Sequence, residues 1–65
     1  MSRSEHIAES NQTLQNMIVK VSQIRRYRIE TGLEHPDTMR IWDKLNAQYH
    51  SLTSDDKMIF DDFIN

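Results

Sequence analysis

The sequence has one basic cluster, Arg25-Arg26-Tyr27-Arg28, which is its strongest candidate for a binding function. Arginine forms bidentate hydrogen bonds to carboxylates and phosphates, and tyrosine adds a large contact area at low entropic cost. A helix dipole favours positive charge near the end of a helix, but lysine would satisfy it equally well. We therefore predict that these four residues bind a larger protein with an acidic or mixed-charge surface.

Residue types that act in metal sites are present, but their spacing does not suit a site. The histidines His6, His35 and His50 are never three or four residues apart, as helical metal ligands are. The aspartates between Asp55 and Asp62 lack the alternating oxygen ligands and the glycine of a calcium loop. The sequence predicts neither a metal site nor a cofactor.

Hydroxyl groups close to His50 suggest a nucleophile and its base, namely those of Ser51, Thr53 and Ser54. A catalytic serine also needs a group that orients the base, and an oxyanion hole in a cleft. A small chain has little material for a cleft, and helix capping explains Thr53 and Ser54. We expect no catalytic residues and no enzymatic activity.

The composition excludes several other classes of protein. The chain has 65 residues with no cysteine, one glycine and one proline. It therefore has no disulfide, no cysteine-ligated zinc and no glycine-rich nucleotide loop. No apolar stretch approaches the ~20 residues of a membrane span, and residues 1–10 lack the apolar segment of a signal peptide. We expect one cytoplasmic domain, residues 1–65, that contacts no membrane.

The net charge of −2 is unevenly distributed along the chain. Residues 1–33 carry five basic and three acidic side chains, whereas residues 34–65 carry three basic and seven acidic ones. The acidic half would repel duplex phosphates, which disfavours general DNA binding. The division suits a protein partner, or the association of opposite ends of two copies.

Apolar residues three and four positions apart predict a first helix of about 20 residues. Gly32 follows it as the expected left-handed C-cap, and Leu33 is expected to fold back as the hydrophobic contact of that cap. Residues 1–11 are polar and form either a frayed arm or an extension of this helix. The apolar stripe consists of Leu14, Met17, Val21 and Ile24, with Ile18 and Ile29 beside it.

Two further helices are predicted. Pro36 suits the first position of the second helix, and Asp37 suits its first turn. Thr53 is the expected N-cap of the third, with Asp56 as its partner in a capping box. The apolar faces are Met39, Trp42, Leu45, Tyr49 and Leu52 in the second helix, and Ile59, Phe60, Phe63 and Ile64 in the third. Because short loops make neighbouring helices antiparallel, the predicted fold is all-α, a small antiparallel helical hairpin with a short third helix.

The lengths of the first two helices predict an apolar surplus. The first spans ~30 Å and the second ~24 Å, so the hairpin cannot cover the whole first stripe. We expect Trp42 to anchor the core, and the alternative is an exposed residue at a binding interface. We place self-association, as a homodimer, on Leu14, Met17, Val21 and Ile24.

One segment resembles a known family. Gly32-Leu33-x-x-Pro36, followed by Met39-x-Ile41-x-x-x-Leu45, is similar to the loop and second helix of the small two-helix phosphatases that dephosphorylate sporulation response regulators. The ungapped register covers residues 14–52. At the positions of that family's Ser-x-x-x-Asp motif this sequence has Trp42 and Asn46. The resemblance therefore implies a helical hairpin that lacks the polar pair of the phosphatase.

These observations predict a small non-enzymatic regulator that binds a larger protein, as an inhibitor, adaptor or antirepressor. The compact size suggests a virus- or mobile-element-encoded protein. One alternative is a dimeric nucleic-acid-binding regulator that uses the cluster from Arg25 to Arg28. A third is a degenerate relative of the two-helix response-regulator phosphatases.

Overall fold

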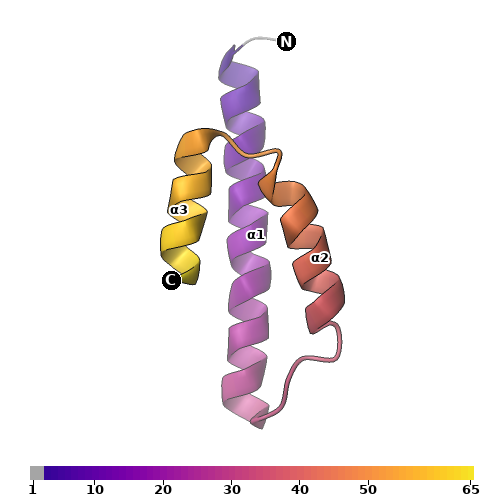
Figure 1. Ribbon diagram of the computed structural model, residues 1–65. Helices are drawn as coiled ribbons and strands as arrows, with labels where there is room; N and C mark the ends of the chain where they lie inside the picture. Colours follow the sequence, from indigo (N-terminus) through magenta and orange to yellow (C-terminus); the bar gives the residue numbers. More distant parts are fainter. Residues whose placement is uncertain (1–2) are drawn as a thin grey trace.

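The computed structural model describes residues 3–65, with side chains described from His6 onward. Three α-helices form: α1 (Arg3–Thr31), α2 (Thr38–Tyr49) and α3 (Ser54–Ile64). No strand occurs within residues 3–65 (Figure 1). The predicted all-α class, a hairpin with a short third helix, is confirmed.

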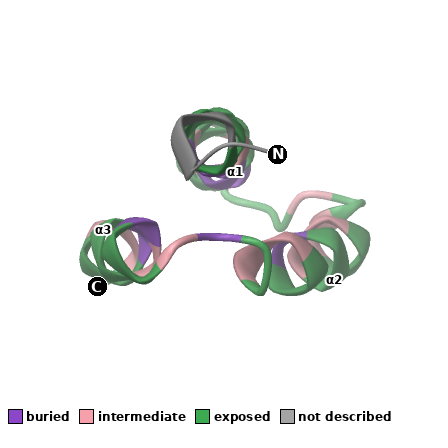
Figure 2. Ribbon diagram, turned by 90° about the horizontal axis from the view of Figure 1, so that it is seen from above, coloured by how far each residue is buried: buried purple, intermediate pink, exposed green. Residues whose placement is uncertain are grey.

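Helix α1 is the axis of the molecule, and α2 and α3 pack on two of its flanks (Figures 1 and 2). The hairpin makes α2 antiparallel to α1, and the turn after α2 returns the chain so that α3 runs in the direction of α1 (Figure 1). At 1.5 Å per residue, 29 helical residues span about 44 Å. This equals the 44 Å length of the molecule, so α1 sets its longest dimension.

The core lies where α1 faces the two shorter helices. Met17 and Val21 of α1 are fully buried, and Leu45 of α2 and Phe60 of α3 close over them. Trp42 and Tyr49 pack against this core but are only half-buried. Trp42 is therefore a partly exposed flank of the core and not its centre. The buried apolar residues are Leu14, Met17, Val21, Ile24, Leu45, Leu52 and Phe60.

Four residues predicted to contribute to apolar faces or to the apolar cap are instead exposed. The C-terminal end of α1 extends past the start of α2 (Figure 1), so nothing packs on Ile29, which is 83% exposed. Met39, in the first turn of α2, is also 83% exposed. The remaining two are Leu33 and Ile59.

The end of α1 has the predicted left-handed glycine but not the predicted apolar contact. Gly32 has φ +71° and donates its N–H to the Arg28 carbonyl at 2.9 Å. The predicted apolar contact of Leu33 with the helix is wrong. The Thr31 hydroxyl instead forms hydrogen bonds with backbone groups of this turn. That hydroxyl accepts the Leu33 N–H at 3.1 Å and donates to the Tyr27 carbonyl at 2.8 Å. The cap is therefore polar.

Within the segment 1–11, the chain is helical from Arg3 onward, and residues 1 and 2 lie outside the described part. Of the two interpretations of this segment, the helix extension is the one observed. Ser10 is 2% exposed, because it faces the start of α3. This part of α1 therefore belongs to the folded domain.

Helix α2 begins later than predicted. Its first residue is Thr38 and Asp37 is its N-cap, so Pro36 and Asp37 lie in a turn before the helix. His35 holds this turn: its Nδ1 accepts the Asp37 N–H at 3.0 Å, and its carbonyl accepts the Thr38 hydroxyl at 2.7 Å. These local bonds occupy the groups that would otherwise start a helix at Pro36.

Helix α3 begins as predicted. Thr53 has extended backbone angles, and its side chain accepts the Asp56 N–H at 3.3 Å. The reciprocal half of the capping box comes from α1, because the Ser10 hydroxyl accepts the Thr53 N–H at 2.8 Å and donates to the Asp56 carboxylate at 2.5 Å. Asp56 is thereby satisfied at 5% exposure, and this bond network fixes α3 on α1.

Candidate functional site

The predicted patch from Arg25 to Arg28 is divided among different partners. The Arg25 guanidinium donates to the carbonyls of Phe63 at 3.3 Å and Ile64 at 2.9 Å, at the end of α3. It also lies over the Phe63 ring, 5.1 Å from the centroid. Arg25 therefore satisfies carbonyls that have no partner within the helix, and it has a structural role.

The other three residues of the patch point in different directions around α1. Arg26 pairs with Glu30 one turn later, at 3.0 Å on the exposed surface. The half-buried Tyr27 ring makes an edge contact with His35, with centroids 4.9 Å apart. Arg28 is exposed. The four residues thus do not form one continuous surface.

The stripe predicted for self-association lies in the core of a single chain. Leu14, Met17, Val21 and Ile24 are each at most 8% exposed. The predicted surplus arose from comparing α1 with α2 alone, whereas α3 covers the other flank of α1 (Figure 2). A dimer through these four residues would require α2 or α3 to leave α1.

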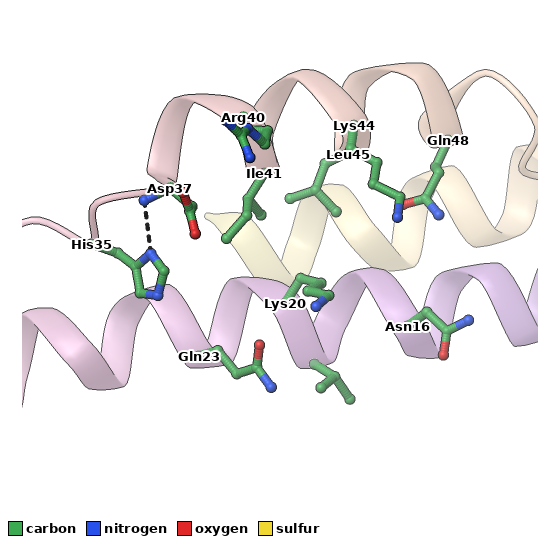
Figure 3. Close-up of a pocket in the computed structure, with 11 residues that line it drawn as sticks. Asn16, Lys20, Gln23, His35, Asp37, Arg40, Ile41, Lys44, Leu45 and Gln48 are labelled. Carbon is green, nitrogen blue, oxygen red and sulfur yellow. Dashed lines mark hydrogen bonds between the residues drawn. The ribbon is translucent and has the colours of Figure 1, made fainter.

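A hollow between α1 and α2 forms a groove, which we call the basic groove (Figure 3). It encloses about 540 Å³. Its apolar floor consists of Val19, which is 52% exposed, with Ile41 and Leu45. The other lining residues are Asn16, Lys20, Gln23, His35, Asp37, Arg40, Lys44 and Gln48.

Three cationic side chains define the chemistry of this groove. Lys20 comes from α1, and Arg40 and Lys44 come from successive turns of α2 (Figure 3). Asp37 is the one carboxylate among the lining residues. In the part of the chain with described side chains, none of the three cations lies within 4 Å of a carboxylate oxygen. Three positive charges around an apolar floor suit a ligand that is both acidic and partly apolar.

One end of the basic groove is formed by the turn before α2. The backbone N–H of Asp37 donates to Nδ1 of His35, so this nitrogen is the acceptor and carries no proton (Figure 3). The edge contact with Tyr27 holds the same ring against α1. His35 therefore has a fixed orientation at the end of the groove.

The sequence-based prediction missed Lys20, Arg40 and Lys44 as a group. Arg40 and Lys44 are four residues apart, which places them on one face of a helix. The position of Lys20 follows from the antiparallel pairing of the two helices. Counting residues back from the loop along both helices places Lys20 opposite Arg40 and Lys44. The predicted loop length and helix ends were close to the observed ones. The register of the hairpin could therefore have been derived from the sequence, and it would have brought the three cations together.

The described residues contain neither a cluster that could bind a metal nor a helix that could span a membrane. No three His, Asp or Glu side chains there come together in a way that could hold a metal ion. His6, Glu9 and His50 do line one smaller hollow near the turn between α2 and α3. No helix among the described residues combines the length and apolar character needed to cross a bilayer.

Comparison of the chain with protein families, curated proteins and solved structures finds no match. The resemblance to the two-helix phosphatases thus gains no support from a family match.

Proposed function

We propose that this chain is a small protein-binding regulator that docks an acidic, amphipathic segment of a larger protein in the basic groove. The proposal rests on one observation: Lys20, Arg40 and Lys44, none paired with a carboxylate of the described residues, line the same groove as two accessible apolar side chains. These are Val19, which is exposed, and Ile41, which is half-buried. The class of function is the one predicted from the sequence. The proposed binding surface is the basic groove, in place of the cluster from Arg25 to Arg28. The lack of cysteine suits a cytoplasmic location.

The shape of the groove favours a peptide segment. Its lining runs from Asp37, the N-cap of α2, to Gln48 near the end of that helix, a distance of about 16 Å along the helix axis. That length accommodates about three turns of an added helix. An amphipathic helix places apolar residues on one face, toward Val19 and Ile41, and acidic residues at the edges of that face, toward the cations.

Electrostatics favour an acidic protein over nucleic acid. The cations of the groove belong to a chain whose net charge is −2, and α3 carries four aspartates and one lysine. A nucleic acid extends well beyond one groove and would meet this negative charge, whereas a short acidic segment need not. Contacts to a phosphate backbone would also leave the apolar floor of the groove without a partner.

Binding of a labelled synthetic helix, with leucine on one face and glutamate on the others, tests the proposal by fluorescence anisotropy. We expect binding that weakens with added salt, because exposed charge pairs are screened. The double variant Arg40→Gln/Lys44→Gln should bind about tenfold more weakly, a loss of ~1.4 kcal/mol.

The matched control is Arg26→Gln/Arg28→Gln, which removes the same charge from the cluster first predicted to bind. This control should retain the affinity of the natural chain. An equal loss of affinity in both double variants would indicate that the peptide binds the cluster from Arg25 to Arg28, or that it responds to net charge alone. Failure to bind the peptide, together with salt-dependent binding of a DNA duplex, would replace the proposal with nucleic-acid binding.

A further inference from the structure

One surface of α3 is both acidic and apolar, and we call it the outer face of α3. Its four residues follow steps of three and four positions, which places them on one face of the helix: Asp55, Met58, Ile59 and Asp62. All four are exposed, Met58 at 66% and Ile59 at 50%. Among the described side chains, no cation pairs with either carboxylate of this face. Two accessible apolar side chains therefore lie between two available negative charges.

The other sides of α3 are occupied by contacts within the chain. Asp56 and Phe60 are buried on the side that faces the core (Figure 2). Lys57, the one cation of α3, lies 5.6 Å from the centre of the Tyr49 ring, and the Tyr49 hydroxyl donates to Asp61 at 3.0 Å. The positive charge of α3 is therefore directed toward α2, and the outer face keeps its acidic character.

The outer face has the features that suit the basic groove. Lys20, Arg40 and Lys44 are cations that no described carboxylate pairs with, and the outer face offers two carboxylates for them. Its apolar pair matches the apolar floor of the groove. Helix α3 has 11 residues and is about 16 Å long, which equals the length of the groove lining. The charge, apolar content and length of α3 thus all fit the groove.

This fit cannot form within one chain. Helices α2 and α3 lie on different flanks of α1 (Figure 2), and the groove is on the α2 side. The Ser10 and Arg25 side chains hold both ends of α3 on its own flank. The outer face can therefore reach only the groove of another copy.

We infer that the basic groove of one copy binds the outer face of α3 of a second copy, with the apolar pair on the floor and the two carboxylates toward the cations. The inference rests on the proposed function in taking the groove as a site for acidic helices. A second copy and a partner segment then compete for one groove, so self-association regulates access to it. A contact through one short helix face buries less than about 1,200 Å², and such small interfaces are weak. The chain therefore stays monomeric at low micromolar concentration.

Sedimentation equilibrium of the full chain over a range of concentrations tests this inference. At low salt we expect the average mass to rise above 7.8 kDa at about 0.5 mM chain, as for other weak and small interfaces. Salt at about 0.5 M should return the mass to that of the monomer, because it screens exposed charge pairs. An excess of the leucine and glutamate helix should also separate the copies, because it occupies the groove.

Two double variants with the same change of charge locate the contact. Asp55→Asn/Asp62→Asn removes the carboxylates of the outer face and should weaken self-association about tenfold. Glu34→Gln/Asp43→Asn removes two exposed carboxylates that lie outside the groove lining and outside α3, and should leave self-association unchanged. Circular dichroism of both variants verifies that they fold.

A mixture of two variants tests whether different surfaces of the two copies meet. Asp55→Asn/Asp62→Asn keeps an intact groove, and Arg40→Gln/Lys44→Gln keeps an intact outer face. Each variant alone should associate less than the natural chain. Their equimolar mixture should form a dimer, because one contact in it joins an intact groove to an intact outer face.

Two outcomes would overturn the inference. One is a natural chain that stays monomeric at about 1 mM and low salt, above the range expected for a weak interface. If the synthetic acidic helix still binds such a chain, the proposed function stands and only the inference fails. The other is a variant mixture that associates no more than its two components, which would place self-association on other surfaces. Association that follows the variants as expected, in a chain that does not bind the synthetic helix, would support the inference and contradict the proposed function.

Discussion

The Ser10 hydroxyl is held between the Asp56 carboxylate and the Thr53 amide, where α3 begins. Its removal would leave a buried carboxylate and a backbone N–H without these partners, which costs about 1–3 kcal/mol in free energy of unfolding. We expect Ser10→Ala to lower stability by that amount in urea denaturation.

Ser22→Ala is the control for this prediction. Ser22 is exposed on the same helix, and surface changes of this kind are usually within about ±0.5 kcal/mol. Equal stability of Ser10→Ala and Ser22→Ala would contradict the role of the Ser10 bonds.

Tyr49 gives a second prediction at the level of one residue. Its hydrogen bond to Asp61 raises the pKa of Tyr49 above the ordinary value of 10.0, and burial and the negative charge of Asp61 act in the same direction. The neutral phenol therefore stabilises the folded chain below pH 10, and this contribution is lost as the pH rises through the raised pKa.

Tyrosinate absorbance measures this shift. In a Tyr27→Phe background, Tyr49 is the one remaining tyrosine, and its midpoint should lie above 10.0. Asp61→Ala should return the midpoint toward 10.0. A midpoint that does not change with Asp61→Ala would show that the two side chains are not bonded in solution.

At the scale of the helices, Arg25 connects α1 to the end of α3. It donates to two carbonyls that the helix leaves without partners, and its guanidinium lies over Phe63. We expect Arg25→Ala to destabilise the chain by about 0.5–1 kcal/mol and to increase the hydrogen exchange of amides in the last turn of α3. Arg28→Ala, on the same helix, should leave that exchange unchanged. If both variants exchange alike, Arg25 is not the cap.

The sequence predicts the helices well where the signal is local. The left-handed Gly32 and the Thr53 N-cap depend on residues within a few positions, and both are observed. The start of α2 was placed two residues early, because the bonds of His35 to the turn have no strong sequence signature. Ile29 and Met39 were misplaced because periodicity shows an apolar face but not whether another helix reaches it.

The binding surfaces were harder to predict, since they depend on contacts between distant parts of the chain. Ser10 and Asp56 are 46 residues apart, so their bond could not be inferred before α3 was placed. The role of Arg25 depends on the end of α3, which lies beside it only in the folded chain. Its bond to the Ile64 carbonyl therefore has no signal in the local sequence. Lys20, Arg40 and Lys44 form one groove only in the register of the folded hairpin.

At the scale of the whole molecule, the apolar stripe of α1 is covered within one chain. We therefore expect sedimentation velocity to find a folded species of 7.8 kDa at micromolar concentration. A stable dimer would contradict this expectation and would direct attention to the exposed Ile29 and Met39.

The central claim is that the basic groove binds an acidic partner segment, and backbone amide chemical shifts test it most directly. Titration of the isotope-labelled chain with the leucine and glutamate helix should shift the amides of Lys20, Arg40 and Lys44, and those of the floor residues Val19 and Ile41. The amides from Arg26 to Arg28 should move little. Shifts centred on Arg26 to Arg28, or no shifts at saturating peptide, would contradict the claim.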